Sequence, residues 1–373
     1  GPLVFENERL RRAYVGLQAW KARILSDPWG ITATWAGADV CGYTGVFCGP
    51  AVDDPCERTV VGIDLNHADL AGTLPTHLPH HLTDLTLFHL NSNRFCGEIS
   101  ANWARLIRVV ELDLSNNRFV GAFPLALLDI PGLVYLDLRF NEFEGEIPAR
   151  AFEKESLDAL FLNNNRFSGP IPGNLGESRA SVLVLANNLL SGALPPSIGE
   201  MGASLNEIVL LNNNLSGCVN PDIGQLREVT VLDLSFNRIS GKLPETVAEM
   251  VSLRELDVAG NELSGEIPPE ICALPSLRNF TYAHNFFFGE APNCLDDLQA
   301  SDEGTTAYPG AHPNDHFLNV HDTCPTNPSV NIPPLTIKAK VKVKVKVKVT
   351  NTISIIMVMV ITTLCMVTLT FDI

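Results

Sequence analysis

Carboxylate side chains recur at fixed positions along the chain, next to short Leu-x-Leu segments. Asp fills the variable position in LDLSNN, LDLRFN and LDLSFN. Carboxylates can act as general acids and bases when one pocket holds two of them at different pKa values. Here the same position is filled in repeat after repeat, and no nucleophile elbow, HExxH zinc motif, phosphate-binding loop or dinucleotide fingerprint accompanies it. The pattern favours a binding surface over an enzyme, and we predict no catalytic site and no cofactor.

An internal repeat supplies the elements that position these side chains. Asn recurs nine times, in steps of 23 to 25 residues, within the frame LxLxxNxLxGxIP. Alternate residues of a strand point to opposite faces, so the two leucines point inward and their neighbours point outward. The period is typical of leucine-rich repeats. We predict an α/β solenoid of about ten plant-type repeats, the first of which has Ala68 in place of Asn.

The outward positions define a candidate binding surface on the concave side of the array. Acids together with apolar groups suit a basic peptide, because charge guides its approach while buried rings hold the complex. The acids are Asp64, Glu111, Asp113, Asp137, Glu207, Asp233, Glu255 and Asp257. The aromatic and aliphatic residues are Leu87, Tyr135, Phe140, Phe161, Val184, Val209, Leu211 and Phe236. The alternative is that each phenylalanine packs on a side chain of a neighbouring repeat.

Net charge separates the repeats from the end of the chain. The chain has 26 basic and 42 acidic residues, and residues 325–373 hold six Lys and one Asp. Residues 1–324 therefore carry 20 basic and 41 acidic side chains. Such a body should repel nucleic acid and attract basic ligands. The acidity could instead serve only to keep a large solenoid soluble.

Composition divides the chain into five segments. We expect an N-terminal cap (1–58), leucine-rich repeats (59–292), a C-terminal capping flank (293–324), a low-complexity linker (325–352) and a hydrophobic tail (353–373). The tail is long enough to span a bilayer. It fits a spurious or truncated reading frame, a lipid-anchor signal or a single membrane span, so membrane association depends on whether the tail is genuine.

The N-terminal cap should cover the apolar edge of the first repeat. Apolar residues at helical spacing between residues 6 and 25 predict a helix. We expect Trp20, Trp29 and Trp35 to form the core of this cap.

Paired cysteines indicate an oxidising compartment. Cys41 and Cys48 stand in CGYTGVFC, and we predict a disulfide there. Cys272 and Cys294 have similar offsets in adjacent repeats, which predicts a second disulfide that closes the C-terminal cap.

Other cysteines have no predicted partner within the chain. Cys96 and Cys218 lie about five strand spacings apart, too far for a disulfide. Each could be a free buried thiol, or one of them, or Cys56, could link two chains.

Two sequons predict N-glycosylation, at Asn214 and Asn279. Asn279 precedes an inward phenylalanine, so a glycan there would lie on the concave side. His312, His316 and His321 match no metal motif, and we predict no metal site.

Several segments resemble the leucine-rich repeat extensin-like proteins of plants: NFTYAHNFFFGEAPNC, CGYTGVFC, GIDLNHADLAGTLP, LTLFHLNSNRFCGEI, LDALFLNNNRFSGPIP and LNEIVLLNNNLSGC. The resemblance covers about residues 5–324. It implies a secreted, non-enzymatic protein of the plant cell wall that binds basic, cysteine-rich peptides of the rapid alkalinization factor type. It further implies a homodimer, a role in wall integrity and cell growth, and an indirect association with pectin or other wall polymers.

The resemblance also implies a set of ligand-facing residues: His89, Asn91, Phe161, Asn163, Glu207 and Val209. One departure is plain, because the family continues into a Ser- and Pro-rich extensin module where this chain has only Pro333 and Pro334 before a Lys-Val run. Two rival functions use the same architecture. They are a secreted inhibitor of pectin-degrading polygalacturonase and the ectodomain of a membrane receptor.

Overall fold

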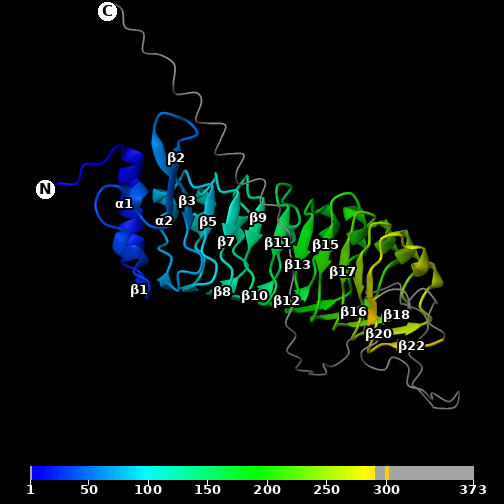
Figure 1. Ribbon diagram of the computed structural model, residues 1–373. Coiled ribbons are helices and arrows are strands. Elements are labelled where there is room, and N and C mark those ends of the chain that lie inside the picture. The colour runs from blue at the N-terminus through cyan, green and yellow to red at the C-terminus, as the bar shows by residue number, and fades with distance from the viewer. Residues whose placement is uncertain (1, 290–298, 302–373) are drawn as a thin grey trace, which may run out of the picture.

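The chain forms a solenoid of stacked repeats, and the computed structural model describes residues 2–289 and 299–301 of it (Figure 1). Two sheets run side by side along the solenoid, one of twelve strands and one of eleven. This confirms the predicted leucine-rich repeat solenoid. The predicted linker and hydrophobic tail lie outside the described residues, as do Cys294, Cys324 and the three histidines considered for a metal.

The twelve-stranded sheet contains the Leu-x-Leu segments, and its outward surface is called the concave face below. Its strands are parallel except for the first pair, β2 and β3, which is antiparallel. The strands, in spatial order, are β2 (Val46–Pro50), β3 (Arg58–Asp64), β5 (Leu87–His89), β7 (Glu111–Asp113), β9 (Tyr135–Asp137), β11 (Ala159–Phe161), β13 (Val182–Val184), β15 (Glu207–Val209), β17 (Val231–Asp233), β19 (Glu255–Asp257), β21 (Asn279–Thr281) and β23 (Gln299–Ser301). β23 comes from the segment for which the sequence predicted a flank without the repeat.

The eleven-stranded sheet contains the second, short strand of each repeat. From β6 onward, each of its strands follows the core Asn of its repeat, and a glycine with positive φ, such as Gly145 at 81°, lies near its end. The strands are β1 (Ile24–Ser26), β4 (Ala71–Thr73), β6 (Arg94–Gly97), β8 (Arg118–Ala122), β10 (Glu142–Glu146), β12 (Arg166–Pro170), β14 (Leu189–Gly192), β16 (Asn214–Cys218), β18 (Arg238–Gly241), β20 (Glu262–Gly265) and β22 (Phe286–Phe287).

Short helices complete the repeats. α1 (Glu8–Lys21) and α2 (Leu78–His81) are α-helices. The 3-10 helices are Ile31–Thr34, Val40–Gly42, Ala101–Arg105, Leu125–Leu127, Ala149–Ala151, Leu175–Glu177, Pro196–Met201, Pro221–Gln225, Glu245–Glu249 and Pro269–Ala273. Their inward leucines, isoleucines and valines join the strand leucines in one continuous core.

A buried asparagine links each repeat to the one before it. In the middle of the array, Nδ2 of Asn188 donates to the carbonyl oxygens of Leu162 (3.0 Å), Leu185 (3.1 Å) and Ala186 (3.2 Å). Its Oδ1 accepts from the backbone N–H of Phe167 (3.0 Å). The same bonding from Nδ2 to the preceding repeat recurs at Asn93, Asn117, Asn141, Asn165, Asn213, Asn237, Asn261 and Asn285. These bonds satisfy backbone groups where the chain turns, which explains the fixed position of Asn.

The N-terminal helix covers the first repeats, as expected. Asn7 caps α1, because its side chain accepts from the N–H of Leu10 at 2.9 Å. The helix ends at Lys21, so Ile24, which the sequence placed on the helix, lies in β1 instead. Trp20 is fully buried, with its ring centroid 5.6 Å from that of Trp35.

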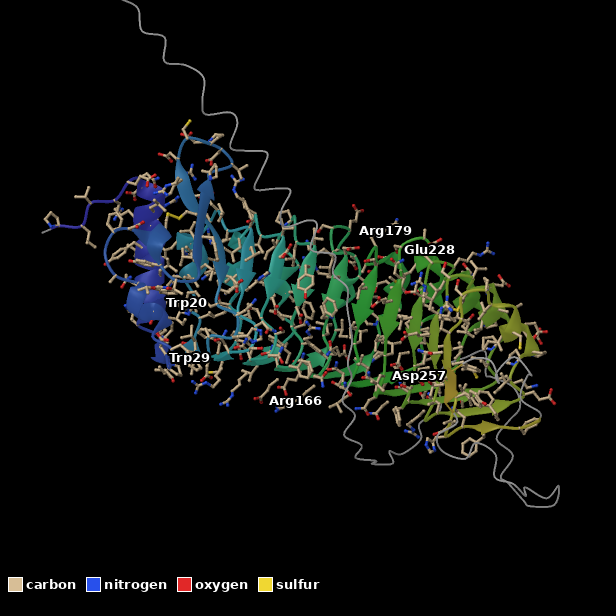
Figure 2. The ribbon with its side chains drawn as sticks, viewed as in Figure 1. Trp20, Trp29, Arg166, Arg179, Glu228 and Asp257 are labelled. Carbon is tan, nitrogen blue, oxygen red and sulfur yellow. A yellow bond between two sulfur atoms is a disulfide. The ribbon has the colours of Figure 1, made fainter. Side chains whose placement is uncertain are left out.

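The prediction for Trp29 was wrong. Its side chain is 71% exposed, and Figure 2 shows it at the lower end of the N-terminal cap, away from the core. It precedes Gly30, whose φ is 65°. The turn that this glycine makes carries the ring outward while the following Ile31 packs against the core.

The cysteines follow the predictions in part. Cys41 and Cys48 form the predicted disulfide, with Cα atoms 5.5 Å apart. Cys272 is disulfide-bonded, and so is Cys218, which was considered a free thiol. Cys96 carries a free thiol but is exposed and not buried.

Candidate functional site

Two rows of side chains run across the concave face in register. Parallel pairing places residues of successive strands beside one another, about 4.8 Å apart. The first row is Leu87, Glu111, Tyr135, Ala159, Val182, Glu207, Val231, Glu255 and Asn279. The second row is Asp64, His89, Asp113, Asp137, Phe161, Val184, Val209, Asp233, Asp257 and Thr281. A ligand on this face would therefore meet several strands at once.

An apolar cluster occupies the middle of the concave face and is separate from the main core. Its buried members are Phe161, Val184, Ala186, Val209 and Leu211. Its partly exposed members are Tyr135, Ala159, Val182 and Val231. We call these nine residues the concave apolar cluster. Because the second row is buried in the middle of the face, at Asp137, Phe161, Val184 and Val209, the side chains open to a ligand there come mainly from the first row.

A polar group bounds this cluster on its N-terminal side. Asp137 is fully buried, and its carboxylate accepts from Nε of Arg139 at 2.9 Å and from the hydroxyl of Tyr135 at 3.1 Å. The Arg139 guanidinium lies 5.0 Å from the centre of the Phe161 ring, a cation–π contact. Phe161 is only 2% exposed, which differs from the expected exposed ring. The predicted acid at Asp137 is thus paired within the protein.

The two acids of the neighbouring strand β7, Glu111 and Asp113, are also paired. Nε2 of His89 lies 3.5 Å from the Glu111 carboxylate, and this contact is the main cause that lowers the pKa of Glu111. Asp113 accepts from the hydroxyl of Ser115 at 2.6 Å, and Ser115 in turn accepts from the Asn91 amide. The N-terminal half of the face therefore presents a network that is already satisfied.

The acids on the C-terminal side are different. Glu207, Asp233, Glu255 and Asp257, called the C-terminal acidic cluster below, lie on three strands, and within the described residues none of them makes a salt bridge. Burial raises the pKa of Asp257 to about 6, and repulsion from Asp233 adds to this. Burial raises the pKa of Glu207, and repulsion from Glu255 adds to this. Burial also raises the pKa of Asp233, although the hydroxyl and the backbone N–H of Ser235 donate to this carboxylate and partly offset the shift. Among the described residues, no Lys, Arg or His side chain pairs with these carboxylates. A ligand could therefore supply the missing cation.

Stability should fall as the pH rises from 5 to 7.5. The pKa values of Asp137 and Asp257 are raised to about 7 and about 6 from an ordinary 3.8, so the folded state holds protons that the unfolded chain has lost. Their contribution is complete below about pH 4 and disappears through pH 6 to 7. We expect the melting temperature to fall by about 3–6 °C, and Asp257→Asn to reduce this slope. A melting temperature that rises over this interval in calorimetric scans would contradict the assignment.

All eleven predicted contact residues lie on or beside the two rows. Asn91 and Asn163 come just after their strands, and Oδ1 of Asn163 is buried without a hydrogen-bond partner in the part of the chain described. Sequence reasoning missed Ala159, Val182 and Val231. Their signal was available, because each takes the same outward place in its strand as Glu111 and Glu207.

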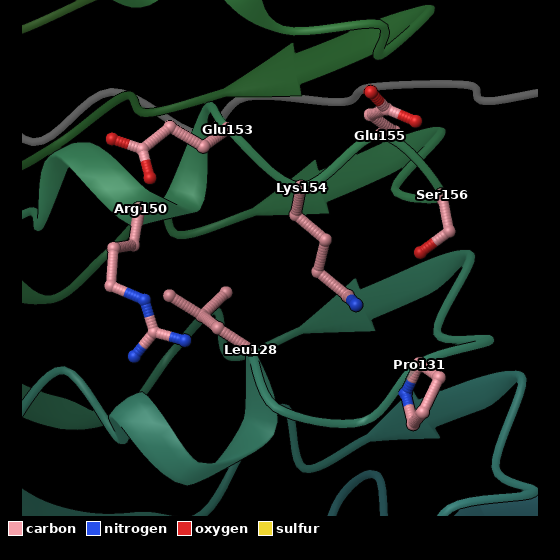
Figure 3. A pocket seen from close by; sticks show the side chains of 7 residues that line it. All are labelled: Leu128, Pro131, Arg150, Glu153, Lys154, Glu155 and Ser156. Atoms are coloured by element: carbon pink, nitrogen blue, oxygen red, sulfur yellow. The ribbon is translucent and has the colours of Figure 1, made fainter.

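One hollow of the surface lies away from this face. It encloses about 550 Å³ between two consecutive repeats, and its lining residues are shown in Figure 3. Lys154 donates to the carbonyl of Ile130, and Arg150 pairs with Asp129 at 2.6 Å, so its basic groups are already engaged. No three His, Cys, Asp or Glu side chains among the described residues are grouped so as to hold a metal ion. Within the same residues, no helix is long and apolar enough to cross a membrane.

Comparison with known sequences agrees with this architecture. The Leucine Rich Repeat family profile matches residues 228–250 and 252–274. Over 236 residues the chain is 58% identical to Leucine-rich repeat extensin-like protein 2 of Arabidopsis thaliana, an alignment that covers 63% of this chain and 30% of that protein. The repeat region is therefore similar to that of leucine-rich repeat extensin-like proteins. Over 94 residues the chain is also 62% identical to the Arabidopsis Pollen-specific leucine-rich repeat extensin-like protein 2, covering 25% of this chain and 11% of that protein.

The chain spans less than a third of the length of these curated relatives. Among solved structures, it is similar to the leucine-rich repeat ectodomain of the Arabidopsis receptor kinase HAESA, in complex with an N-terminally extended IDA peptide hormone ligand. The two are 29% identical with a TM-score of 0.68, over 79% of this chain and 49% of that one. The two chains therefore share the leucine-rich repeat fold over most of this chain.

Proposed function

We propose that the concave face binds a basic, cysteine-rich peptide of the rapid alkalinization factor type. The observation that carries this proposal is the order of apolar and acidic side chains along the concave face. The concave apolar cluster lies directly beside the C-terminal acidic cluster, which has unpaired carboxylates. A ligand with an apolar segment next to Lys or Arg would match both at once.

The proposed contacts divide into two kinds. Tyr135, Ala159, Val182 and Val231 give the apolar surface, where burial of the ligand would provide most of the affinity. Glu207 and Asp233 would pair with basic side chains of the ligand. The remaining predicted contacts, which are His89, Asn91, Glu111, Asp113, Asp137, Phe161, Asn163 and Val209, would shape and orient this surface.

The relatives support this proposal at a coarser level. The HAESA ectodomain holds a peptide hormone, and its repeats are arranged as they are here. By analogy with extensin-like proteins, we place the chain outside the cell, in the plant cell wall, where peptide binding would regulate wall integrity and cell growth. We also propose a homodimer, glycans at Asn214 and Asn279, and an association with pectin or other wall polymers that is indirect.

Titration calorimetry of the full chain with a folded rapid alkalinization factor peptide tests the proposal. We expect binding at micromolar protein, and affinity that falls as salt rises, because exposed charges are screened. Affinity should increase from pH 5 to pH 7, since Glu207, Asp233 and Asp257 must ionise to pair with a cation and their pKa values are raised. Absence of binding at micromolar protein would end the proposal.

Two matched double variants test whether the position of the acids or only the net charge of the protein determines peptide affinity. Reversing Glu207 and Asp233 to Lys should weaken binding and flatten its salt dependence. Reversing two exposed acids outside the concave face, Glu142 and Glu262, serves as the control for net charge. Equal affinity in both double variants would remove the acidic cluster from the site.

A further inference from the structure

A second surface follows the rim where the concave face turns into the eleven-stranded sheet. In each repeat, the residue just before the core Asn has a left-handed backbone. Five successive repeats place Phe140 (φ 52°), Asn164 (59°), Asn187 (54°), Asn212 (54°) and Phe236 (52°) there, and we call them the turn row. The backbone N–H of each donates to the next repeat at 2.8–3.0 Å, so the row advances by one strand spacing at every step.

The two phenylalanines are unusual at such positions. Asn and Gly tolerate a left-handed backbone, whereas a bulky side chain there is strained. Both rings are also open to solvent, at 47% for Phe140 and 38% for Phe236. Neither property helps the solenoid to fold, because other repeats fill this place with Asn, Ser, His or Gly. Backbone strain and solvent exposure coincide at Phe140 and Phe236, which indicates that the two rings contact a ligand.

The next repeat makes room for one of these rings. Gly260 takes the turn-row place after Phe236, and a Cβ there would lie 2.9 Å from the Phe236 ring. The glycine therefore lets the ring lie along the row. An extended ligand on the row would meet this ring face on.

Between the two rings, three amides form a hydrogen-bonded chain. Nδ2 of Asn212 donates to Oδ1 of Asn187 at 2.8 Å, and Nδ2 of Asn187 donates to Oδ1 of Asn164 at 3.4 Å. Nδ2 of Asn163 also donates to Asn164, at 2.9 Å. An amide has two N–H groups and two acceptor sites, so each retains bonding capacity toward solvent. The chain fixes the orientation of the amides and leaves a row of donors and acceptors.

We propose that the turn row binds a linear, uncharged polysaccharide of β-linked pyranose units. The rings would stack on the apolar faces of two sugars, and the amides between them would bond hydroxyl groups. Four strand spacings separate the rings, about 19 Å in all, which suits an extended chain of several sugars. This goes beyond peptide binding, which the concave apolar cluster would carry.

The charges beside the row favour a neutral polymer over an acidic one. Arg166, in the adjacent strand, is paired with Glu142 at 2.7 Å, and Arg238 lies 3.7 Å from Glu262. No turn-row residue carries a charge. The net negative charge of the repeats would also repel a polyuronate.

Titration of the full chain with cellohexaose, a β-1,4-linked glucose hexamer, tests this inference. The N-linked sugars are removed first, because the predicted site at Asn214 lies two residues from Asn212. We expect saturable binding that the double variant Phe140→Asn, Phe236→Asn weakens at least tenfold. Its melting temperature should be unchanged or higher, since Asn tolerates the left-handed backbone. A fall in melting temperature would indicate a purely structural role for the rings.

Three controls make the result decisive. Phe286→Asn removes an exposed ring outside the row and should leave binding intact. Maltohexaose, which is α-linked and curved, and a galacturonate hexamer, which is acidic, should bind at least tenfold more weakly than cellohexaose. Equal binding of all three sugars, or no difference between the double variant and the wild type, would overturn the inference. The double variant should bind the peptide as the wild type does. Loss of sugar binding can therefore be distinguished from a failure of the proposed peptide binding.

Discussion

Replacing Asn188 by alanine is expected to lower the free energy of unfolding by about 3–5 kcal/mol. The side chain is buried and bonds three carbonyl oxygens and one backbone N–H, which belong to its own repeat and the one before it. An unsatisfied buried backbone group costs about 1–3 kcal/mol. Urea unfolding followed by circular dichroism would measure the change.

The neighbouring residue provides the control for this substitution. Asn187→Gly also removes an asparagine amide, but its side chain is partly exposed and glycine accepts its φ of 54°. We expect a change of less than about 1 kcal/mol. Similar losses from both variants would mean that the buried asparagines contribute no more than surface ones.

Introducing a positive charge at Val182 is expected to weaken peptide binding by about 10- to 100-fold. Val182 is partly exposed in the middle of the concave apolar cluster. Lysine there would remove apolar contact and repel a basic ligand, and a central contact of this kind is worth about 2 kcal/mol or more. Calorimetric titration of Val182→Lys against the wild type would measure the loss.

A second valine shows whether position matters. Val120 is similarly exposed, at 38%, but lies in β8 of the eleven-stranded sheet. Val120→Lys adds the same charge to the other sheet and should change affinity less than about twofold. Equal weakening by both variants would show that net charge, and not the concave apolar cluster, governs binding.

The repeat pattern in the sequence predicts most of the fold. Nine asparagines in one frame were enough to predict the strands of the concave face and the inward-facing leucines of the core. This works because each repeat contacts only its neighbours, so a local pattern also fixes the distant arrangement. The outward residues could be assigned to the concave face for the same reason.

Pairing between repeats could not be predicted in the same way. Arg139 lies two residues after Asp137, and nothing in the sequence indicated that it would fold back onto that carboxylate and cover Phe161. Trp29 was assigned to the core on its residue type, but a glycine turn carries it outward. Phe140 and Phe236 were placed on the concave face, whereas their left-handed backbone moves them to the rim. In each case the deciding factor is a turn or a neighbouring side chain.

Both sheets begin with an antiparallel pair, β2 with β3 and β1 with β4. β1 and β2 precede the repeats, and the helix α1 beside them buries Leu10, Leu17 and Trp20 in the same core as the first repeats, which covers the apolar end of the array. A repeat added ahead of this cap would lie outside the core that the cap covers, so the array lengthens most readily by units inserted behind the cap. Duplication of a single repeat in the middle would extend the array while its N-terminal end stays closed, so the length of such arrays can change during evolution without loss of solubility.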